Sequence, residues 1–253
     1  MKLLLSAALL VPLLLAAGVS PLWPARRQRG LAQTLAPWAA LPALALALLG
    51  SPDLSLDLPW LLLGARFGLD ATTRVFLFFT AALWLCGGLY AQTYLAGDRA
   101  RARFTAFFLL TCGGNLGLIL AQDIASFYAG FAIMTFSAYG LVVHESSAAA
   151  RRAGRIYVVM AVAGEALLLT GFLWLADVAG TLDMAQAVAA LAHAPARQGI
   201  VWLLLAGFGV KAGALLLHMW LPLAHPVAPT PASAVLSGAI IKAGLLGWLR
   251  FLP

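Results

Sequence analysis

The feature that most constrains this chain is a succession of long apolar stretches separated by short connectors. A helix needs about 20 apolar residues to cross a hydrocarbon core about 30 Å thick, and about eight stretches approach that length. Hydrophobic residues make up 63% of the sequence and charged residues only 10%. This composition is typical of a membrane protein rather than a soluble domain. We therefore expect an all-α polytopic membrane protein with about eight transmembrane helices.

The connectors predict two further elements. Segment 51–70 contains LSLDLPWLLLG, which is too short to cross a membrane and is expected to form a hairpin or a surface segment. Residues 181–194 carry apolar side chains at helical spacing and predict a short interfacial helix before the seventh span. The first apolar stretch also fits a signal peptide, because Ala16-Ala17-Gly18 resembles a cleavage site, although a first membrane span fits equally well. The expected spans are approximately residues 1–22, 31–49, 71–95, 104–121, 124–143, 156–176, 199–219 and 231–252.

The charges in the connectors predict the orientation of the chain. The loops after spans one, three and five carry three arginines each, whereas the loops after spans two, four and six are mainly acidic. Because loops rich in lysine and arginine remain in the cytoplasm, the arginine loops are predicted to be cytoplasmic and the N-terminus outside. We expect a multi-pass protein of the cell inner (plasma) membrane. We divide it into spans one to three, residues 1–103, and a five-helix transport unit, residues 104–253.

Several functional classes lack their sequence motifs here. The sequence contains no CxxC, Walker loop, HExxH or GxSxG, and both cysteines, Cys86 and Cys112, lie inside apolar runs. The net charge of +7 reflects the arginine loops rather than a nucleic-acid surface. We therefore expect no catalytic residue, cofactor or metal in this chain and no nucleic-acid partner. Whether the chain belongs to an enzyme complex stays open at this point.

Two lysines interrupt the last two apolar runs. Thr230-Pro231 is typical of a helix start, which places Lys242 about 16 Å into the eighth span at ~1.5 Å per residue. Lys211 lies at a similar depth, roughly 18 Å from Gly199. A lysine near the middle of the membrane costs roughly 2.5–3.5 kcal/mol on insertion scales. The alternative is that the long side chains reach the interface, but their depth favours a functional role.

Glu165 is the third ionisable residue in the middle of an expected span. It lies about 15 Å beyond Arg155, at the depth of the two lysines. Charges at one depth on neighbouring helices can pair, and a lysine whose charge depends on such a neighbour suits a proton relay. The alternative is a lone neutral carboxyl group in a contact between helices.

Two histidines near the lysine helices are further candidates. His218 follows Lys211 by about two helical turns, which would place both on one face of span seven, and His225 lies in the next connector. Histidine titrates near neutral pH, so either could carry protons between Lys211 and the cytoplasmic side. A hydrogen bond to the connector backbone is the alternative. The flanking glycines, Gly207, Gly209 and Gly213, allow a broken helix seven if it lines an enclosed cavity.

The last two spans resemble a known family. The segment FGVKAG…HMWLPLAHPVAPTPASAVLSGAIIKAGLLGWLR is similar to the signature of antiporter-like, proton-conducting membrane subunits. These subunits occur in respiratory complex I, Mrp-type antiporters and membrane-bound hydrogenases. The sequence AHPVAP…LSGAIIK is most similar to the Mrp and hydrogenase branch. FGLDATTRVFLFFTAALWLCGGLYAQTYLAGD and ILAQDIASFYAGFAIMTFSAYGLV resemble the family's earlier spans. The resemblance implies that Lys211 and Lys242 are the span-seven and span-eight lysines of a polar axis through the membrane.

The chain departs from the family in two respects. The family has a glutamate in span five, where FAIMTFSAY places Ala132, and we expect Glu165 to replace it as the partner of Lys211. The family also continues after span eight with a second, inverted set of spans. We therefore expect the partners to be the lipid bilayer and other membrane subunits, including one that supplies the second repeat.

Three functional hypotheses follow. The first is an ion-translocating subunit, mainly for protons, of a larger redox-driven or antiporter complex, similar to NADH-quinone oxidoreductase or hydrogenase complexes. The second is a structural membrane-arm subunit that does not conduct, which Ala132 allows. The third is the membrane subunit of a non-redox inorganic-carbon uptake complex. The buried Glu/Lys pattern favours the first, with proton and sodium both open as the ion.

Overall fold

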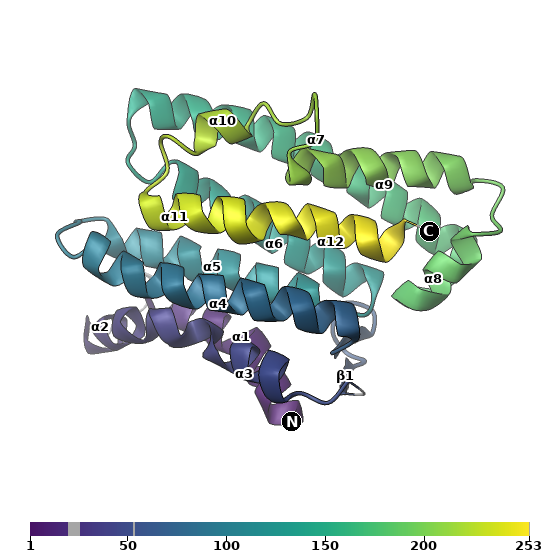
Figure 1. Ribbon diagram of the computed structural model, residues 1–253, viewed down its shortest axis with the longest axis horizontal. Helices are drawn as coiled ribbons and strands as arrows, with labels where there is room; N and C mark the ends of the chain where they lie inside the picture. The colour runs from purple at the N-terminus through teal and green to yellow at the C-terminus, as the bar shows by residue number, and fades with distance from the viewer. Residues whose placement is uncertain (20–25, 53, 253) are drawn as a thin grey trace.

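The chain forms a bundle of long helices with one short hairpin at its end (Figure 1). The computed structural model describes residues 1–19, 26–52 and 54–252. The helices and strands are α1 (Lys2–Val19), α2 (Arg26–Leu35), the 3₁₀ helix η1 (Ala36–Ala40), α3 (Leu41–Leu49), β1 (Ser55–Leu58), β2 (Ala65–Gly68), α4 (Ala71–Tyr94), α5 (Arg101–Leu120), α6 (Ile124–Val142), α7 (Ala148–Ala179), α8 (Met184–Leu191), α9 (Arg197–Ala212), α10 (Leu221–Ala224), α11 (Thr230–Val235), the π-helical turn η2 (Leu236–Ile240) and α12 (Ile241–Phe251).

The prediction of an all-α polytopic membrane protein is confirmed. Within the described residues, 7 helical segments are long and apolar enough to cross a membrane, the last of them being Thr230–Phe251. The remaining expected span is α9, which has 16 residues and ends at Ala212. Gly213 follows with a φ of 68°, a left-handed conformation that glycine adopts without strain, and the chain turns before it re-enters helix as α10. The seventh span is therefore broken directly after Lys211.

Side-chain caps explain where several helices begin. The carboxylates of Asp70, Asp123 and Asp183 accept hydrogen bonds from backbone N–H groups in the first turns of α4, α6 and α8, and the Ser147 hydroxyl does the same for α7. The cap at Asp183 starts the short helix that the sequence predicts over residues 181–194. Figure 1 shows α8 at the same end of the bundle as the C-terminus.

Segment 51–70 forms a hairpin, in which β1 pairs antiparallel with β2 and Ser55 lies opposite Gly68. Arg66 anchors this hairpin, because its guanidinium binds the carboxylates of Asp57 at 2.8 Å and Asp183 at 2.9 Å. The hydrogen bond with Asp57 raises the pKa of Arg66 above its ordinary value.

Small residues bring the central helices into close contact. A methyl group added to Gly130 on α6 would lie 2.6 Å from the Leu118 nitrogen and 3.0 Å from the Gly114 carbonyl oxygen of α5. At Gly207 on α9, the added group would lie 3.0 Å from the Gly164 carbonyl oxygen of α7. Such contacts are typical of membrane helices that pack through small residues. The second contact holds α7 and α9 together beside Glu165 and Lys211.

The two ends of the bundle are tied by polar contacts. At the hairpin end, the buried Arg250 of α12 binds Asp70 at 3.2 Å and also the Thr73 hydroxyl of α4. At the opposite end, the His144 ring lies 2.7 Å from an Asp98 carboxylate oxygen. The hydrogen bond with His144 holds the pKa of Asp98 below its usual value.

Candidate functional site: a charged cavity between helices α6, α7 and α9

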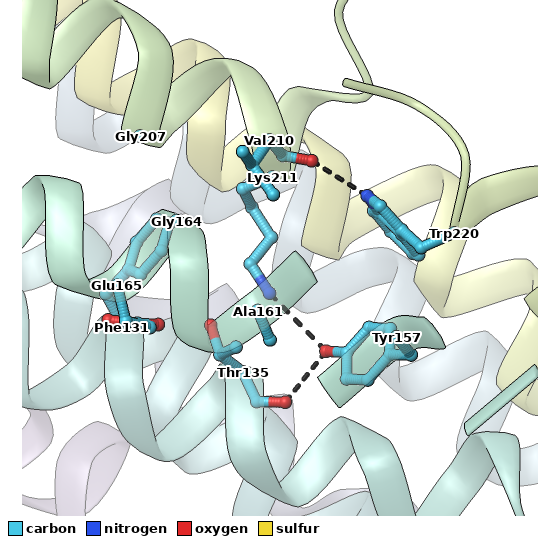
Figure 2. Close-up of a pocket in the computed structure, with 10 residues that line it drawn as sticks. All are labelled: Phe131, Thr135, Tyr157, Ala161, Gly164, Glu165, Gly207, Val210, Lys211 and Trp220. Atoms are coloured by element: carbon cyan, nitrogen blue, oxygen red, sulfur yellow. Dashed lines mark hydrogen bonds between the residues drawn. The ribbon is translucent and has the colours of Figure 1, made fainter. Parts of the chain in front are cut away.

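A small cavity lies where α6, α7 and α9 meet the connector that follows the break in span seven. Glu165 of α7 and Lys211 of α9 both line it, each about 5% exposed (Figure 2). The other lining residues are Phe131, Thr135, Tyr157, Ala161, Gly164, Gly207, Val210 and Trp220. The structure therefore brings together two of the charged residues that the sequence singled out.

Lys211 is held by aromatic side chains and a hydroxyl group. Its Nζ atom donates to the Tyr157 hydroxyl at 3.4 Å and lies 5.6 Å and 5.5 Å from the ring centroids of Phe131 and Tyr157. Cations are attracted to ring faces at such distances. Lys211 also lies in the last turn of α9, where the helix dipole favours a positive charge. These contacts allow an ammonium group to be buried without an acidic side chain in direct contact.

Glu165 faces the same cavity from the other side. Neither of its carboxyl oxygens has a hydrogen-bond partner among the described residues. Thr135 and Lys211 line the same cavity as this carboxyl group. In Figure 2 the ammonium group of Lys211 is turned toward Tyr157, and no dashed line joins it to Glu165. A buried, unpartnered carboxylate is costly, so Glu165 is stable either as the neutral acid or after approaching Lys211.

Tyr157 and Trp220 complete the cavity wall. The Tyr157 hydroxyl donates to the Thr135 carbonyl oxygen at 2.7 Å, which fixes the oxygen that receives Lys211. Trp220 folds back from the connector, donates to the Val210 carbonyl oxygen at 2.8 Å and packs edge-on against Tyr157. The connector that follows the break after α9 thus closes one side of the cavity with the Trp220 side chain. Sequence reasoning missed both residues, because an aromatic residue in an apolar run gives no signal of its own.

Lys242 does not reach this cavity. It lies on an exposed face of α12, and its Nζ atom donates to the Ser237 carbonyl oxygen at 2.6 Å. The structure therefore separates two lysines that the sequence placed at one depth.

The histidines also lie outside the cavity. His218 is exposed, and because α9 ends at Ala212, the helical face that it was expected to share with Lys211 is not formed. His225 is half-buried, and its Nδ1 atom lies 2.8 Å from the Ser233 hydroxyl. Burial lowers the pKa of His225.

Ala132, which occupies the place of the expected glutamate, follows Phe131 on α6 and does not line the cavity. Within residues 1–19, 26–52 and 54–252, no three histidine, cysteine or acidic side chains come close enough together to hold a metal ion.

The fold and this site define a polytopic helical membrane protein with a lysine and a glutamate enclosed between its spans. The family described as "NADH:quinone oxidoreductase/Mrp antiporter, TM" matches residues 121–253, more than half of the chain. The chain therefore belongs to this family, and the predicted resemblance is confirmed.

Individual relatives agree with this assignment. Hydrogenase-4 component B of Escherichia coli (strain K12) is 33% identical over 185 residues, 72% of this chain and 27% of that protein. NADH-quinone oxidoreductase subunit N of Desulfitobacterium hafniense (strain DSM 10664 / DCB-2) is 33% identical over 180 residues, 69% of this chain and 36% of that protein.

A solved structure extends the similarity to nearly the whole fold. A chain in the Mrp complex from Dietzia sp. DQ12-45-1b superposes with a TM-score of 0.79 and 25% identity, over 98% of this chain and 28% of that one. The chain spans little more than a third, or less, of the length of these three proteins. The three proteins are a component, a subunit and a chain of larger complexes.

Proposed function

We propose that this chain translocates ions, mainly protons, as one subunit of a larger redox-driven or antiporter complex in the plasma membrane. The observation that carries the proposal is the enclosure of Glu165 and Lys211 in one cavity without an ion pair between them. Ionisable groups inside a membrane usually pair or mark an ion pathway. Family membership supports the proposed class of protein. The shared cavity supports the choice of Glu165 and Lys211 as the residues that move the ion.

The proposed mechanism uses the separation between the two charged side chains. When the Glu165 carboxylate turns toward Lys211, it stabilises the ammonium form, which keeps its proton. When the carboxyl group turns back toward Tyr128 and Thr135 or takes up a proton itself, that stabilisation is lost. Lys211 can then release its proton to the next acceptor and become a neutral amine. The Tyr157 hydroxyl holds the amine in place in both states.

The proposal includes a partner and an orientation. The family is built from inverted repeats, and residues 104–253 form one five-helix unit, so we propose that a second, inverted unit packs against it. The exposed face that carries Lys242 is available for that second unit. The arginine loops face the cytoplasm and the N-terminus faces outside.

Ala132 favours a second candidate, in which the chain is a structural subunit without transport. It stands where the family has its span-five glutamate, and the cavity then holds a charged pair left without a function.

Proton flux in proteoliposomes that contain the purified complex distinguishes the two candidates. The decay of an imposed pH gradient is measured for the native protein and for Lys211→Ala. An ion-translocating subunit loses its flux in Lys211→Ala, whereas a structural subunit gives the same decay in both. Arg152→Ala is the matched control, because it removes an exposed positive charge from the start of α7. Equal amounts of assembled complex are confirmed before flux is compared.

A further inference from the structure

We propose that a groove between the end of α3 and the start of α4 binds one phospholipid molecule. The lipid phosphate pairs with Arg74, and an acyl chain lies along Val75, Phe78 and Phe79. The site requires neither ion movement through the cavity that holds Lys211 nor an open face beside Lys242. It is therefore independent of the proposed function.

The groove is a defined hollow on the surface of the bundle. It has a volume of about 310 Å³ and is lined by Ala47, Leu48, Arg74, Val75, Phe78 and Phe79. Sites for small molecules typically have volumes of about 300–1,000 Å³. The rings of Phe78 and Phe79 meet edge to face, with their centroids 5.3 Å apart. The groove thus combines one cationic side chain with an otherwise apolar wall.

Arg74 is fixed in the groove by the last turn of α3. Its Nε atom donates to the Ala47 carbonyl oxygen at 2.8 Å, and its Nη2 atom donates to the Leu48 carbonyl oxygen at 3.0 Å. Carbonyl groups at a helix end have no partner within their own helix, so these bonds cap α3. A guanidinium group has five N–H donors, and the cap leaves three of them for a ligand. In the part of the chain that the structure describes, no carboxylate forms an ion pair with Arg74.

The groove changes from charged to apolar in the order of the parts of a phospholipid. Arg74 is the fourth residue of α4, about 6 Å from the helix start, and the headgroup region extends about 5–7 Å on each side of the hydrocarbon core. Phe78 lies one helical turn further into the membrane. Val75, Phe78 and Phe79 are 56%, 38% and 68% exposed. A phosphate at Arg74 is thus followed by an acyl chain along these three side chains.

The groove lies on a different side of α4 from the span that carries Lys242. In Figure 1, α4 runs between α3 and the rod formed by α11, η2 and α12. Leu83 of α4 packs against Gly238 of η2, which covers that flank of α4. Val75 and Phe79 remain exposed on the flank beside α3. A second helix unit that packs beside Lys242 therefore leaves this groove in contact with the lipid bilayer.

Charge complementarity selects a phospholipid over an apolar helix of another subunit as the occupant. Guanidinium and phosphate form paired, charge-assisted hydrogen bonds, because the planar fork of N–H donors matches two phosphate oxygens. An apolar helix in the groove would cover the phenylalanine rings but would bury the cation of Arg74 without an anion, which is costly. A phospholipid satisfies the charged end and the apolar end of the groove at once.

Native mass spectrometry of the purified full complex tests the lipid site without measuring transport. The complex is washed in mild detergent and titrated with phosphatidylglycerol, and the bound lipid molecules are counted at each concentration. We expect binding at this site to be about tenfold weaker in Arg74→Gln, because hydrogen bonds between charged groups are lost. Arg197→Gln, which removes an exposed arginine at the start of α9, is the matched control and should bind lipid as the native complex does.

A second variant leaves Arg74 and its bonds to α3 intact. Val75→Trp fills the groove with a larger ring and should remove the same lipid molecule. Leu173→Trp adds the same ring at an exposed position of α7 and should leave lipid binding unchanged. If Arg74→Gln does not assemble, the comparison of these two tryptophan variants decides the question.

Three results would overturn the lipid site. Equal lipid binding in the native complex, Arg74→Gln and Val75→Trp would show that the groove holds no phospholipid and is covered by another subunit. Equal losses in Arg74→Gln and Arg197→Gln would show that binding depends on net charge alone. Displacement of the lipid by inorganic phosphate would show that the acyl chain and the apolar wall play no part.

Discussion

Helix α9 and the span formed by α11, η2 and α12 each carry a lysine at a similar distance from their starts, and the chain surrounds the two lysines in opposite ways. Lys211 is about 5% exposed, and two aromatic rings and a hydroxyl group contact it. Lys242 is exposed and is held by a carbonyl group of its own helix. Both helices are irregular at the lysine, one through a break at Gly213 and the other through the π-helical turn η2.

The difference shows two ways in which this fold can tolerate a charge within a membrane span. At Lys211 the protein itself replaces water, which isolates the charge and makes it sensitive to Glu165. At Lys242 the protein supplies only one side of the environment, and water or a partner must supply the other. The predictions below test this contrast, in order of decreasing expected effect.

The largest expected effect is loss of transport in Glu165→Gln. Glutamine has nearly the same shape but cannot ionise, so Lys211 loses the charge that controls its proton. We expect the proton flux in proteoliposomes to fall about a hundredfold, the range of an acid–base group in a reaction. Glu145→Gln is the matched control, because it removes an exposed carboxyl group from the α6–α7 loop. Unchanged flux in Glu165→Gln would place Glu165 in a purely structural role.

Tyr157→Phe sharpens the role of the hydroxyl group that holds Lys211. The variant keeps the aromatic ring and removes the hydrogen bonds to Lys211 and Thr135. A lost hydrogen bond to a charged group costs about 1.5–3 kcal/mol. Since 1.4 kcal/mol corresponds to a factor of about ten, we expect the flux to fall about tenfold. Tyr139→Phe on α6, where the tyrosine is 38% exposed, should leave the flux unchanged. Equal losses in both variants would show that the hydroxyl at the cavity has no particular role.

Lys242→Ala tests whether the second lysine contributes to the stability of the chain. Because Lys242 contacts only a carbonyl group that can bind water instead, its removal should change the melting temperature in detergent by less than about 2 °C. Lys211→Ala should lower the melting temperature by several degrees, since it empties a packed site. A larger loss of stability in Lys242→Ala than in Lys211→Ala would reverse the comparison drawn here.

The smallest expected effect is the change of stability with pH that Asp98 causes. It defines the pH range in which the lysine variants can be compared. The pKa of Asp98 is lowered in the folded chain, mainly by the hydrogen bond with His144. Its contribution to stability is therefore fully present above the unfolded value of about 3.9 and is lost as the pH falls through the lower folded value. We therefore expect Asp98→Asn to lower the Tm by an amount that stays constant between pH 5 and 9, as measured by thermal unfolding. A Tm difference that grows between pH 9 and 5 would contradict this assignment.

The bundle could be predicted from the sequence because long apolar runs have few alternative structures. The hairpin over segment 51–70, the helix that begins at Asp183 and the break after Lys211 all followed from local signals such as caps, turn residues and glycines. Similar depth also predicted that Glu165 and Lys211 lie near each other, and both line one cavity, whereas their pairing stays a prediction.

The surroundings of the charges could not be predicted, because depth along a helix does not say which way a side chain points. Lys242 and Lys211 are predicted to lie at similar depths, yet only Lys211 reaches the cavity. Tyr157 and Trp220 complete the site through contacts across the fold, with no local signal in the sequence. His218 was placed on the face of a helix that ends before it.

The most direct test of the central claim is to move the carboxylate rather than remove it. Ala132 lies one helical turn from both Tyr128 and Thr135 on α6, so a glutamate placed there can reach toward Lys211. Proton flux is measured for Glu165→Gln alone, for Glu165→Gln with Ala132→Glu, and for Glu165→Gln with Ile133→Glu, whose position is exposed on the same helix. We expect Ala132→Glu to restore a large part of the flux and Ile133→Glu to restore none. Equal flux in all three variants would contradict the claim that a carboxylate facing Lys211 drives ion movement through this chain.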